Sequence, residues 1–233
     1  MKRVVIIGLL TIIGICPILG QPRHIQPNGI AQLPTASYAE YIRLAERDAQ
    51  SKSLTARERK IVEDYTVYDD LYAGYCSWYC GGEVLKVTAT SCLHPIGKFS
   101  YDASHAHDFD HESVWAEGAK GQGIGESLTY EFAGGCPRIT TVNILNGHVK
   151  SEKAWRENSR VKELLVYYNG MPYAILDLQN SRTLQSFDVG VLGFHDPAAK
   201  NWTLKFEILS VYPGTKYEDT VISELYFDGI DVH

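Results

Sequence analysis

The sequence has none of the short motifs that mark the common hydrolase and nucleotide-binding classes. It contains no Gly-x-Ser-x-Gly, no His-Glu-x-x-His and no P-loop motif. Positive charge is also scarce, because 22 Lys and Arg residues stand against 28 Asp and Glu residues and give a net charge of −6. An acidic chain repels nucleic acid and anionic lipid, so neither is an expected partner. These absences favour binding over catalysis.

Repeats, heptads and low-complexity tracts are absent as well. Charged residues make up only 21% of the chain and hydrophobic residues 45%, so the chain can bury a core and is not expected to be disordered. A length of 233 residues suits one sandwich or barrel domain with a small appendage.

No apolar run is long enough for a comfortable membrane span. The longest, Val4–Leu19, contains Pro17 and follows the basic start Met1–Arg3. This order is typical of a secretory signal peptide. We therefore predict that residues 1–20 are a signal peptide cleaved near Gly20, that the protein is exported (secreted, periplasmic or at the cell surface), and that the mature chain has no membrane span.

Cys16 leaves two other outcomes open. A lipid anchor would need a small residue before the cysteine, and Ile15 stands there instead. An uncleaved N-terminal anchor is the third possibility. Export in any of these forms would bring the remaining cysteines into an oxidising compartment.

Four cysteines follow the signal peptide, and an even number in an exported chain indicates disulfides. They are Cys76, Cys80, Cys92 and Cys136. Four cysteines allow three pairings, and the sequence does not choose among them. Closeness along the chain favours Cys76–Cys80, which leaves Cys92–Cys136. A metal site at the first pair is the weaker interpretation, because no second ligand pair has zinc-finger spacing.

Residues 21–75 are expected to form a linker followed by helices. The start of this segment is rich in Pro, Gln and Gly, which is typical of a loose N-terminus. Apolar residues then recur at helical spacing over Tyr38–Ala49. A second helix is predicted after the capping box of Thr55 and Glu58, and it should stop near Gly74.

Residues 76–233 are expected to form one β domain. From Glu83 onward the apolar period becomes two, which predicts strands. The segments that fit are 85–89, 128–132, 139–145, 164–168, 173–178, 183–189, 202–208 and 221–227. Asn169-Gly170 should join two of them in a type I′ hairpin. The fold predicted is mainly β, an antiparallel β-sandwich or jelly roll preceded by a short α-helical segment.

The segment from Asp108 to Trp115 is the most informative stretch. Its sequence, Asp-Phe-Asp-His-Glu-Ser-Val-Trp, resembles the Asp-Gly-Asp-x-x-Thr-x-Trp loop of the discoidin-like, or F5/8 type C, superfamily of galactose-binding-like β-sandwiches. Phe109 stands where that loop has Gly, and Ser113 stands where it has Thr.

Further matches follow in order along the chain and are together more specific than any one of them. They are Cys76–Gly82, Trp115–Gly118, Gly121–Glu126, Asn146-Gly147, Asn158–Lys162, Tyr212–Thr220 and Ile222–Leu225. With them the chain is similar to the NADase-type glycan-binding domain, named after the translocation domain of streptococcal NAD glycohydrolase. The resemblance implies a noncatalytic module that attaches an exported protein to a glycan, such as a cell-surface carbohydrate.

A calcium ion is the expected cofactor. Two aspartates, Asp108 and Asp110, can converge in a loop on a hard cation that prefers oxygen ligands. The resemblance adds Ser113 of the same loop and a glutamate near the last strand, which Glu224 matches. The alternative is that the aspartates only cap a turn by accepting backbone N–H bonds. Neighbouring histidines would also suit zinc, although solvated or backbone-bonded histidines are the plainer interpretation.

The candidate ligand site is the loop end formed by residues 108–125 and 155–162. Sugars stack their C–H faces on aromatic rings, while Arg, Asn and Glu bind the hydroxyl groups. The candidate ligand-binding residues are Glu117, Glu126, Trp155, Asn158 and Arg160.

Two other classes of function stay open at this point. Glu117 and Glu126 could act as general acid and base on a glycosidic bond if their separation and burial suited that chemistry, which would make the protein a secreted glycoside hydrolase or another hydrolase. A structural cell-envelope protein is the third class, with the predicted helices as its docking element.

Overall fold

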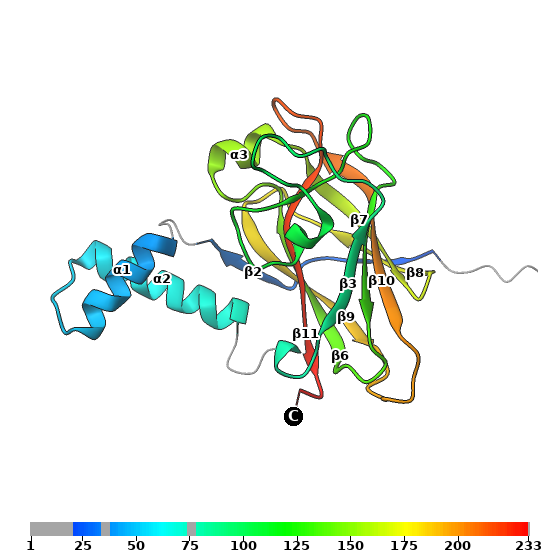
Figure 1. Cartoon of the computed structure of the whole chain (residues 1–233), viewed down its shortest axis with the longest axis horizontal. Helices are drawn as coiled ribbons and strands as arrows, with labels where there is room; N and C mark the ends of the chain where they lie inside the picture. The colour runs from blue at the N-terminus through cyan, green and yellow to red at the C-terminus, as the bar shows by residue number, and fades with distance from the viewer. Residues whose placement is uncertain (1–20, 34–37, 74–77, 233) are drawn as a thin grey trace, which may run out of the picture.

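A computed structural model of the chain describes residues 21–33, 38–73 and 78–232. Residues 1–20, and with them the predicted signal peptide and Cys16, lie outside the described residues. Within the described ranges the chain forms two β-sheets that pack face to face, with a helical hairpin projecting from one side (Figure 1).

The two sheets contain six and five strands. The first has the order β1 (Arg23–Ile25), β8 (Met171–Asp177), β7 (Arg160–Tyr168), β10 (Trp202–Tyr212), β5 (Ser127–Phe132) and β3 (Val84–Ala89). The second has the order β2 (Gly29–Gln32), β9 (Thr183–Leu192), β6 (Arg138–Asn146), β11 (Val221–Ile230) and β4 (Trp115–Ala116). Neighbouring strands are antiparallel except β1 and β8. The predicted mainly-β sandwich is confirmed, and each of the eight predicted strands is present.

Alternation along the strands builds the core between the sheets. Every second residue is buried there from Leu128 to Phe132 in β5 and from Trp202 to Ile208 in β10, which matches the period of two in the sequence. Strand β3 is the exception, because Leu85 is 46% exposed. A register shift between Val84 and Lys86 in the pairing with β5 inserts one extra residue, and this bulge turns Leu85 outward while Val87 stays against the core.

The predicted hairpin turn between β7 and β8 is confirmed. Asn169 and Gly170 have φ angles of 50° and 79°, the left-handed values that a type I′ turn requires at both central residues. Its twist matches that of the flanking strands, so the local sequence determines this connection.

The segment 21–33, which the composition indicated to be a loose linker, instead adds one strand to each sheet. Strand β1 pairs with β8 at the edge of the first sheet, and β2 pairs with β9 at the edge of the second. The segment therefore runs along one side of the sandwich and passes from the edge of the first sheet to the edge of the second (Figure 1). Strands of three and four residues are too short for a period of two to reveal them.

The two predicted helices are α1 (Tyr38–Ala49) and α2 (Ala56–Ala73). The capping box is confirmed, because Glu58 N donates to Thr55 Oγ1 at 3.2 Å and Thr55 N donates to Glu58 Oε2 at 2.9 Å. The Thr55 N–H bond to the carboxylate, the guanidinium of Arg47 and the Thr55 hydroxyl lower the pKa of Glu58 to about 2.

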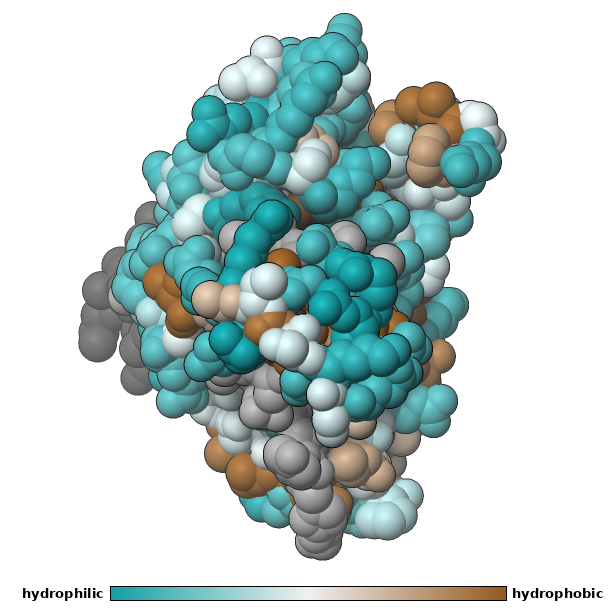
Figure 2. Space-filling view, turned by 90° about the vertical axis from the view of Figure 1, so that its left-hand side faces the viewer, coloured by the Kyte–Doolittle hydropathy of each residue, from teal (hydrophilic) through white to brown (hydrophobic). Residues whose placement is uncertain are grey.

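The helices pack on each other through a small core of Leu44, Leu54 and Ile61. Figure 2 looks at the molecule from the side on which the hairpin projects and shows a surface that is largely hydrophilic. No helix in the described ranges combines the length and apolar character needed to cross a membrane. Three short helices complete the fold: η1 (Trp78–Cys80), η2 (Ala103–Ala106) and α3 (Glu152–Glu157).

The predicted disulfide between Cys92 and Cys136 is wrong for this structure, in which both thiols are free. Cys136 Sγ lies 3.5 Å from the carbonyl oxygen of Glu83, just before β3, whereas Cys92 follows the other end of that strand. At about 3.3 Å per residue, the six residues of β3 separate its two ends by roughly 20 Å. Cys80 is also free. The predicted Cys76–Cys80 disulfide is therefore not formed in this structure either, although Cys76 itself lies outside the described residues.

Candidate functional site

A pocket of about 850 Å³ opens at the end of the sandwich where β6 and β7 are joined through α3. Three chain segments line it: 93–116, which connects β3 to β4, 148–158, which includes α3, and 217–221, which leads into β11. Loops build this pocket on a rigid sheet scaffold, which is the usual arrangement for binding sites.

Aromatic rings stand exposed on the pocket wall. The side chains of Phe99 and Tyr217 are 53% and 42% exposed. The ammonium groups of Lys98 and Lys150 lie 5.5 and 5.6 Å from the centre of the Phe99 ring. The pocket thus combines flat apolar surfaces with charged hydrogen-bond donors.

His148 supplies an unpaired polar atom to the same pocket. Its Nδ1 atom is buried and has no hydrogen-bond partner. Burial, and secondarily the charge of Lys150, lowers the pKa of His148 to about 4, so the imidazole is neutral at pH 7. The sequence prediction missed Phe99, Tyr217 and His148, because an aromatic residue in a loop carries no sign of whether it is buried.

Of the predicted ligand-binding residues, only Asn158 lines this pocket. Its Nδ2 atom donates to the carbonyl oxygen of Ala154 at 2.8 Å, which closes the C-terminal end of α3. The helix begins at Ser151, whose hydroxyl oxygen accepts from Ala154 N at 3.1 Å. Local capping therefore sets where α3 presents Asn158.

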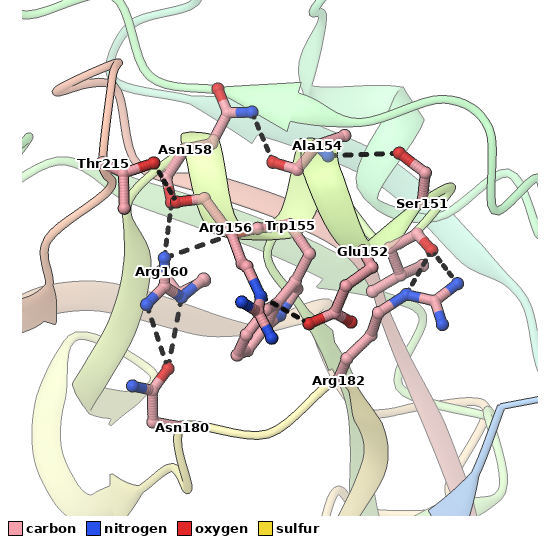
Figure 3. Close-up of polar contacts among 11 residues, drawn as sticks. Ser151, Glu152, Ala154, Trp155, Arg156, Asn158, Arg160, Asn180, Arg182 and Thr215 are labelled. Atoms are coloured by element: carbon pink, nitrogen blue, oxygen red, sulfur yellow. Dashed lines mark hydrogen bonds and ion pairs between the residues drawn. The ribbon is translucent and has the colours of Figure 1, made fainter.

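The Trp155 side chain, on the inner face of α3, and the Arg160 side chain, at the start of β7, hold α3 in place (Figure 3). The Arg160 guanidinium donates to the carbonyl oxygens of Trp155 and Asn158 at 3.3 and 2.8 Å, and to Asn180 Oδ1 at 3.2 and 3.1 Å. It also stacks 4.5 Å from the Trp155 ring, whose Nε1 donates to the carbonyl of Asn146 at 2.9 Å. Both side chains are buried, so they brace the pocket wall and are not placed to touch a ligand.

Glu117 is fully buried and ties its loop to β11. Its Oε1 accepts from Thr220 N at 3.1 Å and its Oε2 accepts from Ala119 N at 2.8 Å. Burial raises the pKa of Glu117, while these two N–H groups oppose the rise. A Cβ atom at Gly123, where φ is +65°, would lie 2.4 Å from Glu117 Cγ, so glycine is required there.

Glu126 directly precedes β5 and bonds to a different set of residues from Glu117. Its Oε2 accepts from Thr90 Oγ1 at 2.6 Å and from Ser91 Oγ at 2.5 Å. Neither Glu126 nor Glu117 is among the residues that line the pocket. The structure therefore places neither carboxylate on this pocket.

The predicted calcium loop folds around Asp108. Its Oδ1 accepts from Asp110 N at 3.1 Å and from Ser113 Oγ at 2.9 Å. Ser113 Oγ also lies 3.0 Å from the carbonyl oxygen of Asp110. The Asp110 carboxylate accepts from Glu112 N at 2.9 Å. Asp110 therefore offers its carbonyl oxygen to this cluster, and its side chain caps the turn.

Glu224 reaches the same loop from β11. Neither of its carboxylate oxygens has a hydrogen-bond partner within bonding geometry, and the residue is fully buried. Burial, followed by the neighbouring Asp108 carboxylate, raises the pKa of Glu224 to about 10, against the smaller opposing effect of the backbone N–H groups of Phe109 and Asp110. Two carboxylates, a hydroxyl and a carbonyl provide only oxygen donors, so these residues fit a calcium ion.

Phe109 adopts the left-handed conformation, with φ of 59°, at the position where the F5/8 type C loop has glycine. That conformation costs about 1–2 kcal/mol for a residue with a Cβ atom. The Phe109 ring packs 5.2 Å from Tyr79 and 5.8 Å from Tyr226, and aromatic pairs of this kind contribute about 0.5–1.5 kcal/mol each. The loop therefore keeps its turn although Phe109 stands in place of glycine.

The neighbouring histidines have separate partners. His105 Nδ1 lies 2.8 Å from Asp108 Oδ2, whereas His107 Nδ1 lies 2.8 Å from the carbonyl oxygen of Leu225. Burial lowers the pKa of His107, which favours its neutral form. Because the two imidazoles are held by different groups, they do not form a joint zinc site.

A two-sheet β-sandwich with a loop-built pocket and a folded Asp-x-Asp loop is the architecture of an F5/8 type C, discoidin-like domain. The family model for the NAD glycohydrolase translocation F5/8 type C domain matches residues 78–228. The chain belongs to this family. No curated protein matches it.

Solved structures of similar fold include two from Clostridium perfringens. The CBM32 domain CpGH89CBM32-5, in complex with GalNAc-β-1,3-galactose, is 16% identical with a TM-score of 0.44, and the match covers 62% of this chain and 94% of that one. The CBM32-1 and CBM32-2 domains of ZmpB, in complex with GalNAc, are 13% identical with a TM-score of 0.48, covering 71% of this chain and 38% of that one.

The Streptococcus pyogenes NAD⁺-glycohydrolase translocation domain is also similar. It is 24% identical with a TM-score of 0.35, and the match covers 50% of this chain and 98% of that one.

Proposed function

We propose that the protein is an exported, noncatalytic carbohydrate-binding module that binds a glycan in the pocket between α3 and the β3–β4 connection. The observation that carries this proposal is the pocket itself, with Phe99 and Tyr217 exposed on its wall. Exposed rings bind the apolar C–H faces of sugars. Lys150, His148 and Asn158 line the same space and can exchange hydrogen bonds with hydroxyl groups.

Membership of the F5/8 type C family supports the same assignment, because the resemblance implies attachment of an exported protein to glycan. The acidic chain fits a neutral, polar partner better than nucleic acid. In this proposal the helical hairpin α1–α2 stays clear of the pocket.

A calcium ion would stabilise the site from beneath. Glu224, the Asp108 carboxylate, Ser113 Oγ and the Asp110 carbonyl would hold it, and its charge would compensate the buried Glu224 carboxylate. The ion would fix the Asp108–Ser113 turn, and Asp110 and Ser113 of that turn line the pocket.

A hydrolase that uses Glu117 and Glu126 is the weaker alternative. General acid and base catalysis needs carboxylates that reach the substrate. Both oxygens of Glu117 are instead occupied by backbone N–H groups, and the residue is buried away from the pocket. We therefore place Glu117 in the scaffold.

A glycan array with the purified protein tests the proposal. We expect the protein to bind a defined group of glycans, and Phe99→Ala and Tyr217→Ala each to weaken binding by about tenfold, since a stacking ring contributes about 1 kcal/mol or more. Circular dichroism should show an unchanged fold, because both side chains are exposed.

Phe194→Ala is the matched control. Phe194 is 47% exposed, but it follows β9 at the opposite end of the sandwich. Its removal should leave glycan binding unchanged. Binding that survives both pocket substitutions, or that is lost in the control, would contradict the proposed site, and a protein that binds nothing on the array would contradict the function.

A further inference from the structure

A group of metal-ligand side chains lies on the outer face of the six-stranded sheet, away from the pocket. Glu163 of β7 and Asp177 of β8 are directly opposite each other in the antiparallel pairing. His24 of β1 is the register partner of Ile175, two residues from Asp177. Residues two apart on a strand share a face, so topology brings an imidazole and two carboxylates together from three strands.

The distances suit one small cation. His24 Nδ1 lies 2.9 and 3.0 Å from the two oxygens of Asp177. One ligand atom from each of His24, Glu163 and Asp177 lies within 4.8 Å of the others. Among the described residues, this is the one group of three or more His, Cys, Asp or Glu side chains with that spacing. In a tetrahedral zinc site with bonds of about 2.0–2.2 Å, ligand atoms are roughly 3.4 Å apart, so small side-chain rotations would suffice.

The charge of the group is poorly compensated by the chain. Like charges directly opposite on neighbouring strands destabilise a sheet. Among the described residues, no lysine or arginine nitrogen forms an ion pair within 4.0 Å of Glu163 or Asp177. The cationic partner that the structure offers is His24, which is charged only when protonated.

Neighbouring polar groups orient the two carboxylates. Ser210 Oγ donates to Glu163 Oε2, and Gln26 Nε2 donates to Asp177 Oδ2 at 2.6 Å. Hydrogen bonds of this kind hold the ligands of metal sites in place. The His24 side chain is 54% exposed, which leaves room for a metal-bound water.

We propose that His24, Glu163 and Asp177 bind one divalent transition-metal ion, with zinc as the preferred metal. One imidazole and two carboxylates suit zinc, whereas calcium prefers oxygen ligands alone. Because His24 belongs to the three-residue strand β1, the metal fastens the segment 21–33 to the sandwich. A ligand that binds only this docked arrangement stabilises it by mass action.

Equilibrium dialysis of the purified protein against zinc chloride, in buffer that contains millimolar calcium, tests the proposal. Calcium is present to occupy the oxygen cluster at Glu224. We expect one zinc ion per chain, and we expect His24→Ala and Asp177→Asn each to raise the zinc Kd by at least about tenfold. His94→Ala removes another exposed histidine and should have no effect.

Hydrogen exchange supplies a second readout. Zinc should slow amide exchange in residues 21–33 of the wild-type protein and leave it unchanged in His24→Ala. Circular dichroism checks that each variant is folded, and Glu163→Gln serves as a further ligand variant. Absence of stoichiometric zinc, zinc binding that His24→Ala and Asp177→Asn leave unaltered, or zinc binding that is lost in His105→Ala instead would overturn the proposal.

Discussion

Two sets of buried polar groups lie toward the loop end of the sandwich, and they differ in whether the chain itself satisfies them. The bonded set comprises Glu117, Asn146 and Arg160, whose side chains bond mainly to backbone groups. The unpaired set comprises Glu224, with two buried oxygens that lack partners, and His148, with one buried nitrogen that lacks a partner.

This difference shows that burial alone does not assign a role to a polar residue. Glu117 and Glu224 are both fully buried carboxylates, yet Glu117 accepts two backbone N–H bonds that join two loops, whereas Glu224 lies beside the Asp108 carboxylate and neither of its oxygens has a partner within hydrogen-bonding geometry. Buried polar groups in native proteins nearly always have partners. An unpaired one is therefore a candidate for a partner outside the chain, and we propose a cation for Glu224 and a ligand in the pocket for His148.

Replacement of Trp155, whose ring packs against Arg160 of the bonded set, should have the largest effect on stability. Trp155→Ala leaves a cavity under α3 and should lower the free energy of unfolding by about 3–5 kcal/mol, measured by urea denaturation. Phe194→Ala, with an exposed ring, should change stability by less than about 0.5 kcal/mol. If Trp155→Ala kept full stability and lost glycan binding, Trp155 would be a ligand contact and would not support α3.

Glu117→Gln tests whether this carboxylate belongs to the scaffold. The amide keeps one acceptor but turns an NH₂ group toward a backbone N–H, so stability should fall by about 2–3 kcal/mol. The loss should be the same in calcium and in EDTA, because Glu117 is not one of the proposed ligands. A loss of stability that appears only in the presence of calcium would instead indicate that Glu117 is a calcium ligand.

Glu224→Gln should produce the opposite pattern. At calcium concentrations about 100 times Kd the wild-type protein should gain about 2.7 kcal/mol, and the variant should gain almost none. In EDTA the variant should be about as stable as the wild type, because the raised pKa of about 10 keeps Glu224 protonated and neutral at pH 7, so the substitution removes no charge. Melting curves with and without calcium measure both effects, and an equal calcium response in the two proteins would exclude Glu224 as a ligand.

The smallest effect concerns His148 and pH. Its pKa is lowered from 6.5 to about 4 in the folded protein, so between these values the unfolded chain binds more protons. Its contribution to stability is therefore present above pH 6.5 and is lost as the pH falls toward 4.

We expect His148→Asn to show a shallower dependence of unfolding free energy on pH in this window than the wild type. His107 and His111, whose pKa values are also lowered by burial, contribute equally to both proteins. Parallel pH curves for the two proteins would show that His148 is solvated.

Features with local causes were readable from the sequence. The period of two in β5 and β10, the Asn169-Gly170 turn and the Thr55–Glu58 capping box each depend on neighbours a few residues away, and each is present as expected. The ordered series of short matches also indicated the family to which the chain belongs.

Tertiary packing decided the rest. Whether Trp155 and Arg160 face a ligand or brace α3 depends on contacts with Asn146 and Asn180, which lie in other elements. The two short edge strands of residues 21–33 exist only through pairing with β8 and β9, more than 140 residues away. Partners and burial are long-range properties, so the amino-acid sequence by itself determined the strands and the family, while the three-dimensional fold decided which buried polar groups have partners within the chain and which do not.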